Sequence, residues 1–204
     1  MKKINENLTY TCEKCSNILE YRLNECLDVV MHDSYFDRLI SCFLYKGEIR
    51  EKILKFKFFN KPFLGKVFSK YIAYILKKKD ISIDLIVPVP MYYMRYFVRG
   101  YNQSEILAKV ISDEVGVRFS SNVLKKVRKS RVQSTLNAKD RKNNVMNTYS
   151  VNKKNEILGK SILLVDDIYK TGANVDECSK VLWPKDSNFS LIPANLIAEG
   201  PMSE

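Results

Sequence analysis

Hydrophobic positions along this chain follow two spacings, one typical of helices and one typical of buried strands. Apolar stripes with a period near 3.6 residues predict helices over 48–59, after Pro62 and over 103–115. Short continuous apolar runs predict buried strands at 83–89, 159–165 and 189–198, with 36–44 as a further candidate. Strands and helices that alternate in this way predict a parallel sheet with helices on both faces.

Several segments carry more detailed expectations. The stripe after Pro62 should face the core through Leu64, Val67, Phe68, Tyr71, Ile72, Ile75 and Leu76. A last helix is predicted over 174–182, where Asn174 can cap it and Glu177 stands at capping-box spacing. The aromatic and basic stretch 92–101 is expected to form a loop. Residues 125–149 show no apolar period, which is typical of a functional lid or a disordered connection.

Composition is that of a globular protein and favours one main domain. Hydrophobic residues make up 46% and charged residues 28% of the 204 residues, which excludes general disorder. Residues 1–35 are polar and weakly patterned, and we expect them to form a small N-terminal segment. Residues 36–204 then form the main domain.

The positive charge is concentrated in two segments. The net charge is +11, while residues 49–79 hold ten basic and one acidic side chain and residues 125–143 hold eight and one. Such segments indicate polyanionic partners, such as nucleic acid, phosphorylated small molecules or an anionic membrane surface. Solvated helix faces are the alternative explanation.

The cysteines and the apolar runs bear on location and chemistry. No apolar signal region or membrane-spanning stretch is evident, so we expect a cytoplasmic protein whose five cysteines are reduced. His32 is the single histidine, which argues against histidine-based catalytic triads.

The strongest chemical signal lies where the strand over 159–165 leads into Asp166 and Asp167. Ligands of open parallel sheets bind at the carboxyl ends of the strands. Two carboxylates can accept hydrogen bonds from the vicinal hydroxyls of a ribose or help to hold Mg²⁺. Gly172 allows the backbone to approach a phosphate, and the following helix N-terminus offers free N–H groups. This combination predicts a phosphorylated-sugar site.

This motif resembles the site for phosphoribosyl pyrophosphate (PRPP) in type I phosphoribosyltransferases. More narrowly, the chain resembles the ComF family of competence-associated, amidophosphoribosyltransferase-like proteins. The blocks that carry this resemblance are Phe43–Arg50 with Ile53–Phe58, Ile86–Pro90 with Arg95 and Arg99–Ser104, Gln133–Leu136, and Asp140–Arg141 with Asn144–Val145. The resemblance implies an α/β fold of the type I phosphoribosyltransferase kind. Its sheet would be twisted and mostly parallel, with a small hood and the cysteine-containing N-terminal segment.

The resemblance also implies roles for individual residues. Asp166 and Asp167 would bind the ribose hydroxyls and Mg²⁺, and the loop for the 5′-phosphate would consist of Lys170, Thr171, Gly172, Ala173 and Asn174. The pyrophosphate side would comprise Val87, Pro88, Val89, Pro90, Arg95 and Arg99. A flexible loop over 128–149 would close on the substrate and supply Gln133 and Arg141.

The N-terminal cysteines suggest a zinc site. Cys12 and Cys15 have the spacing of a zinc knuckle, and Cys26 with His32 could complete four ligands. The alternative is a set of reduced thiols without metal. Cys42 and Cys178 lie in apolar stretches and are expected in the core.

Two functions follow from these observations. The first is a PRPP-dependent phosphoribosyltransferase, or a relative that binds PRPP, associated with DNA uptake. The second is a scaffold that binds single-stranded DNA and works with a transformation helicase. In the second case phosphates would be bound by Lys125, Lys126, Arg128 and Lys129. Stacking faces would come from Tyr92, Tyr93, Tyr96, Phe97 and Tyr101. Ordinary packing of these aromatic residues at the sheet edge is the alternative.

Overall fold

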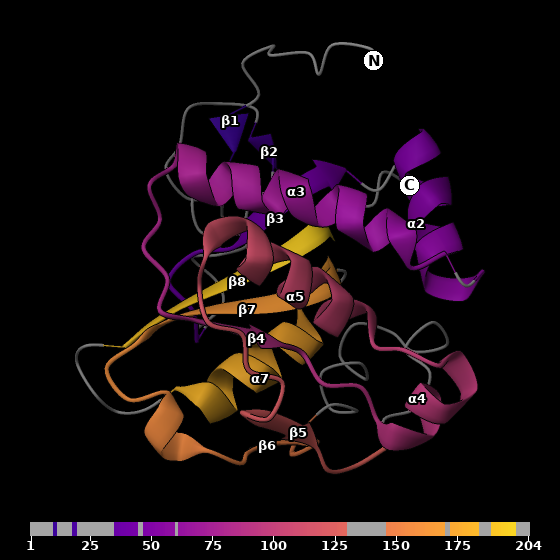
Figure 1. Ribbon diagram of the computed structural model, residues 1–204. Helices are drawn as coiled ribbons and strands as arrows, with labels where there is room; N and C mark the ends of the chain where they lie inside the picture. Colours follow the sequence, from indigo (N-terminus) through magenta and orange to yellow (C-terminus); the bar gives the residue numbers. More distant parts are fainter. Residues whose placement is uncertain are drawn as a thin grey trace.

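The computed structural model has three layers, a central sheet with helices above and below it (Figure 1). It describes residues 10–11, 18–19, 35–44, 47–59, 61–129, 146–169, 172–183 and 189–198. The predicted N-terminal segment is described only at Tyr10–Thr11 (β1) and Ile18–Leu19 (β2), which pair antiparallel. Within the described residues, no helix is long and apolar enough to cross a membrane.

The central sheet has four parallel strands in the order β3-β8-β7-β4. Their bounds are Ile40–Leu44 (β3), Leu85–Pro88 (β4), Ser161–Tyr169 (β7) and Ser190–Ala198 (β8). Each strand falls within or overlaps an apolar run of the sequence. The predicted α/β class with a parallel sheet is therefore confirmed.

One face of the sheet is covered by α2 (Gly47–Phe58), α3 (Phe63–Lys78) and α5 (Gln103–Val115). Their buried apolar side chains pack against Ile86, Leu163 and Ile192 of the sheet. In α5, Leu107 and Ile111 are fully buried, and Gly116 ends the helix in the left-handed conformation. The helix predicted over 103–115 thus has the observed bounds and the expected cap.

Helix α3 faces the core through most of the predicted stripe, including Phe68, Ile72 and Leu76, and α5 packs closely against it. Gly65 and Ser69 are buried, whereas Val67 is 53% exposed, so its placement in the core was wrong. A side chain at position 65 would lie 2.9 Å from the Phe56 ring and 3.0 Å from Ile106. The Ser69 hydroxyl donates to the carbonyls of Gly65 and Leu107, which satisfies a polar group inside this interface.

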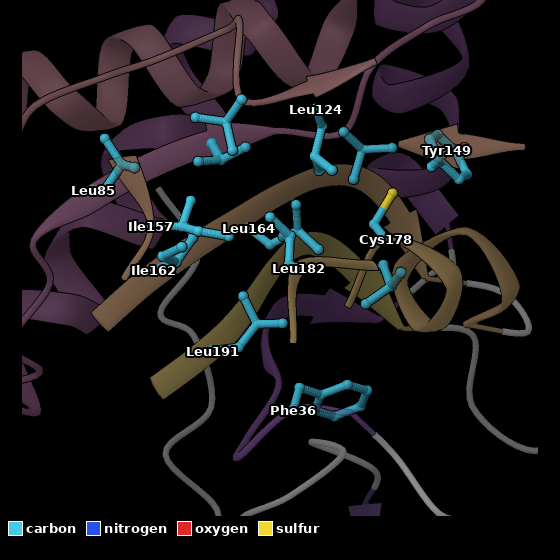
Figure 2. Close-up of a cluster of buried hydrophobic side chains, with 14 of the residues drawn as sticks. Phe36, Leu85, Leu124, Tyr149, Ile157, Ile162, Leu164, Cys178, Leu182 and Leu191 are labelled. Carbon is cyan, nitrogen blue, oxygen red and sulfur yellow. The ribbon is translucent and has the colours of Figure 1, made fainter. Parts of the chain in front are cut away.

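The other face is covered by α7 (Ala173–Leu182) and by a hairpin of Leu124–Lys126 (β5) and Tyr149–Val151 (β6). Figure 2 shows the resulting cluster, in which Leu164 of β7 lies among Leu124, Cys178 and Leu182. The buried Cys178 confirms one core prediction, while Cys42 is only partly buried. A short 3₁₀ turn, Lys154–Glu156 (η2), leads from the hairpin back toward β7.

Three local expectations differ from the structure. The stretch expected as an aromatic loop contains a short helix, Tyr93–Arg99 (α4). Helix α7 begins after Gly172, so Asn174 is not its cap, and Glu177 accepts a hydrogen bond from the Asn147 amide instead of forming a capping box. In the segment 125–149, Tyr149 is a buried strand residue, although the local pattern lacks an apolar period.

We expect Leu164→Ala to lower the free energy of unfolding by about 2–5 kcal/mol, because it leaves a cavity between β7 and α7. Urea denaturation measures this change. The matched control is Leu158→Ala, whose side chain is 51% exposed and whose effect should stay within about 0.5 kcal/mol. Equal effects of the two variants would contradict the packing described for this face.

Candidate functional site

The carboxyl ends of β4 and β7 lie side by side and open into a cleft. Pro88 pairs with Val165 in register, and the Val89 amide donates to the Val165 carbonyl at 2.8 Å. The space within the cleft and at its open mouth, solvent included, is about 570 Å³. Its lining comes from residues far apart in the sequence, namely Lys57, Val89, Pro90, Met91, Tyr92, Arg95, Arg99, Asn102, Gln103, Ser104, Lys126, Lys129, Tyr149, Asp166, Asp167 and Asn174.

The start of α5 organises this cleft through three consecutive polar side chains. Asn102 caps the helix by accepting from the Ser104 amide, and its Nδ2 donates to the Val89 carbonyl at 3.1 Å. Gln103 Nε2 donates to the Lys57 carbonyl at 3.3 Å, while its Oε1 accepts from Arg99 Nη1 at 3.0 Å. The Ser104 hydroxyl donates to Asp166 of β7. The three side chains thereby connect the ends of β4, α2 and β7.

Asp166 and Asp167 are neighbours in sequence but have different partners. Asp166 Oδ1 accepts from the Ser104 hydroxyl at 3.0 Å and from the Asp167 amide at 2.8 Å. Asp167 Oδ2 forms an ion pair with Lys57 Nζ at 2.8 Å. Asp166 therefore meets the first turn of α5, whereas Asp167 meets the last turn of α2.

Burial gives Asp166 an unusual proton affinity. Desolvation, together with the neighbouring Asp167 carboxylate, raises the pKa of Asp166 from 3.8 to about 7. The hydrogen bonds from the Asp167 amide and the Ser104 hydroxyl act in the opposite direction without cancelling this effect. Asp166 therefore titrates near neutral pH, where both of its forms are populated.

Cations outnumber carboxylates around the cleft. Five basic side chains face two carboxylates there, and these are Lys57, Arg95, Arg99, Lys126 and Lys129. Burial lowers the pKa of Arg99, and the nearby Asp167 carboxylate acts in the opposite direction. Charges in a partly desolvated cleft attract an anion more strongly than charges in open solvent do.

One side of the cleft is formed where the β5–β6 hairpin meets the start of α7. Lys126 Nζ donates to the Tyr149 hydroxyl at 2.9 Å and lies 4.7 Å from the centre of its ring. The Tyr149 hydroxyl in turn donates to Asn174 Oδ1 at 3.1 Å. Burial lowers the pKa of Lys126 and raises that of Tyr149 well above its usual value. The hairpin thus brings a lysine to the first turn of α7.

The structure brings together many of the residues singled out from the sequence. Asp166 and Asp167 share the cleft with Val89, Pro90, Arg95, Arg99, Asn174, Lys126 and Lys129. Val87 and Pro88 are buried within β4 and do not line it, and Lys125 and Arg128 are exposed outside it. Gly172 precedes α7 with a φ of 69°, which glycine adopts without strain, and Ala173 is buried behind it.

Other predicted residues lie outside the described residues. They are Lys170 and Thr171 of the 5′-phosphate loop, Gln133 and Arg141 of the flexible loop, and Cys12, Cys15, Cys26 and His32 of the zinc prediction.

Several residues that line the cleft had no assigned role in the sequence analysis, among them Lys57, Ser104 and Tyr149. Lys57 and Ser104 fall in blocks that carry the family resemblance, so the signal was present without a function attached. Tyr149 gave no signal, because its segment lacks an apolar period and its burial depends on α7 and β5.

The described residues contain no group of three or more histidine, cysteine, aspartate or glutamate side chains that could hold a metal by themselves. Mg²⁺ in phosphate-binding sites is commonly held by one or two carboxylates together with substrate phosphates. Asp166 and Asp167 suit that shared arrangement.

No protein-family model matches this chain. Competence protein F of Haemophilus influenzae is 30% identical over 177 residues, which are 84% of this chain and 77% of that protein. The chain belongs to the ComF family. Competence protein ComFC of Streptococcus pneumoniae is 32% identical over 155 residues, 74% of this chain and 66% of that protein.

A third relative of this ComF-family chain is DNA utilization protein YhgH of Escherichia coli. It is 31% identical over 99 residues, which are 48% of this chain and 43% of that protein. The family assignment agrees with the resemblance inferred from the sequence blocks.

The raised pKa of Asp166 predicts how stability depends on pH. Through Asp166 the folded state binds more protons than the unfolded chain between pH 3.8 and about 7, so the contribution of this group to the free energy of unfolding should fall as pH rises through this range. Asp166→Asn lacks this titration and should gain stability relative to wild type as pH rises. Urea denaturation at several pH values measures the difference.

Asp113→Asn, at an exposed position on α5, is the matched control and should follow the wild-type profile. A pH-independent difference between wild type and Asp166→Asn would contradict the assigned pKa.

Proposed function

We propose that the cleft binds PRPP together with Mg²⁺, in a protein that acts in competence or DNA utilization. One observation carries the proposal: a buried carboxylate pair at the end of a parallel strand is surrounded by five basic side chains. Carboxylates accept hydrogen bonds from sugar hydroxyls, and basic side chains bind phosphates. A ligand that satisfies both groups carries a diol and several phosphates, as PRPP does.

Each part of the cleft suits one part of PRPP. Asp166 and Asp167 would accept the ribose hydroxyls. The first turn of α7, whose Asn174 is linked to Lys126 through the Tyr149 hydroxyl, would bind the 5′-phosphate through its N-terminal end and one positive charge. Arg95 and Arg99, which follow β4, would lie along the pyrophosphate.

The same arrangement favours transfer of the phosphoribosyl group to a nucleophilic acceptor. In this reaction the bond between the ribosyl carbon and pyrophosphate breaks, and a bond to the acceptor forms. Charge develops on the leaving pyrophosphate, which Arg95 and Arg99 would stabilise. Mg²⁺ held by the carboxylates and the phosphates would supply further charge neutralisation. The site needs no strong base, so the single histidine of the chain is compatible with this chemistry.

The relatives supply the biological setting of the proposal. Two of them are named competence proteins and one is named a DNA utilization protein. A PRPP-binding member of this family would connect phosphoribosyl chemistry with the handling of incoming DNA.

Titration calorimetry of PRPP with Mg²⁺ tests the proposal. We expect binding by the wild type and a loss of at least about 100-fold in affinity when Asp166→Asn and Asp167→Asn are combined, because two charge-assisted hydrogen bonds disappear. Asp113→Asn changes the same charge on an exposed surface and should bind as wild type does.

Circular dichroism shows whether each variant is folded. A folded wild type that does not bind PRPP would overturn the proposal, and unchanged binding by the double variant would overturn the ribose assignment.

A second candidate function, binding of single-stranded DNA, is favoured by the surface of α4. Tyr93 and Phe97 are 57% and 80% exposed, so they do not pack against the sheet edge as the alternative expected. Tyr101 instead donates to the Phe56 carbonyl and has a structural role. Exposed aromatic rings on the same short helix as Arg95 and Arg99 are typical of surfaces on which bases stack. Lys125, within β5, and Arg128, two residues after it, are both exposed.

Lys125→Gln combined with Arg128→Gln separates the two functions. Each lost phosphate contact should reduce the slope of log affinity against log salt by about 0.7, as fluorescence anisotropy of a labelled oligonucleotide would measure. PRPP affinity should stay unchanged, because neither side chain lines the cleft. An unchanged salt slope would contradict the assignment of these two residues to DNA.

A further inference from the structure

Lys57 forms an ion pair with the Asp167 carboxylate, which is the group that the ribose hydroxyls of the proposed ligand would need. Lys57 Nζ lies 2.8 Å from Asp167 Oδ2, and the two side chains are only 24% and 13% exposed. Both line the cleft. A charge-assisted hydrogen bond of this length in a partly desolvated site is stronger than an exposed ion pair.

The backbone of Lys57 is fixed, so its side chain is the part that can change partner. Gln103 Nε2 donates to the Lys57 carbonyl, and the Tyr101 hydroxyl donates to the carbonyl of Phe56 at 2.6 Å. The same Gln103 side chain accepts from Arg99. Lys57 is thereby held beside the arginine that we assign to the pyrophosphate.

A sugar hydroxyl and the Lys57 ammonium compete for Asp167. A hydroxyl that donates to Oδ2 displaces the ammonium, and a lysine left without a counter-charge in this cleft is destabilised. A phosphate bound near Arg99 offers the displaced ammonium a new partner. The exchange of partners by Lys57 is therefore favourable only for a ligand that brings both a sugar hydroxyl for Asp167 and a phosphate for Lys57.

We propose that Lys57 exchanges Asp167 for the pyrophosphate of the ligand, and so makes recognition of the ribose depend on the presence of the pyrophosphate. Lys57 is then a specificity-determining residue that discriminates PRPP from ribose 5-phosphate. Ribose 5-phosphate carries the diol, but it lacks the group that would accept the displaced lysine. This inference rests on the proposed function of the cleft.

The test compares the affinities of PRPP and ribose 5-phosphate in the wild type and in Lys57→Met. Methionine keeps the apolar stem and removes the charge. We expect the preference for PRPP to fall by about tenfold or more, which is the effect of one charge-assisted hydrogen bond. Lys57→Arg should restore part of the preference. Lys55→Met, at an exposed position of α2, is the matched control and should keep the wild-type ratio.

A second measurement uses inorganic pyrophosphate, which has no diol. Asp167→Asn releases Lys57 and should increase pyrophosphate affinity several-fold. The same substitution made in the Lys57→Met background should give a clearly smaller gain. An equal gain in both backgrounds would mean that removal of a negative charge alone explains the effect, and it would overturn the exchange.

The outcomes separate this inference from the proposed function. A wild type that binds PRPP, with an unchanged preference in Lys57→Met, overturns the role of Lys57 and leaves the PRPP site intact. If Lys57→Met lost affinity for PRPP and for ribose 5-phosphate by the same factor, Lys57 would have a merely structural role, and the proposed exchange would also be overturned. A folded wild type that binds neither PRPP nor pyrophosphate overturns both the PRPP site and the role of Lys57.

Discussion

The arrangement of the cleft depends on three polar side chains at the first turn of α5. Asn102, Gln103 and Ser104 are each less than a tenth exposed, and buried polar groups require partners. Their partners are the Val89 carbonyl, the Lys57 carbonyl and the Asp166 carboxylate, which belong to three different elements. Displacing any one of these elements would leave a buried polar group unsatisfied. The geometry of the site and the packing of the fold are therefore set by the same hydrogen bonds.

This constraint gives two adjacent carboxylates different chemical properties. Asp166 is buried and lies next to the Asp167 carboxylate, so its pKa is raised, whereas Asp167 has the lysine of α2 as a counter-charge. An acidic pair could repel phosphates, but here one carboxyl is partly protonated near neutral pH and the other is neutralised by an ion pair. The surrounding basic side chains can then attract an anion without being opposed by two full negative charges.

The positive charge of the chain is divided between two environments. In the first basic segment most lysines, such as Lys66 and Lys70, lie on exposed helix faces, as the alternative explanation expected, while Lys57 turns into the cleft. In the second segment Lys126 and Lys129 line the cleft, whereas Lys125 and Arg128 face solvent. Small phosphorylated ligands and nucleic acid would thus draw on different basic residues, so the two candidate functions are compatible on one molecule.

The sequence by itself determined the elements, the class of the fold and the acidic motif. Apolar runs located β4, β7 and β8, and the block Arg99–Ser104 carried the family resemblance. Only the tertiary structure decided that Val67 faces solvent, that Tyr149 is buried and that Lys57 meets Asp167. These outcomes depend on contacts between segments many residues apart, such as the close approach of α5 to Gly65. Local periodicity records which side chains are apolar, but long-range packing decides which of them are covered and which charges become neighbours.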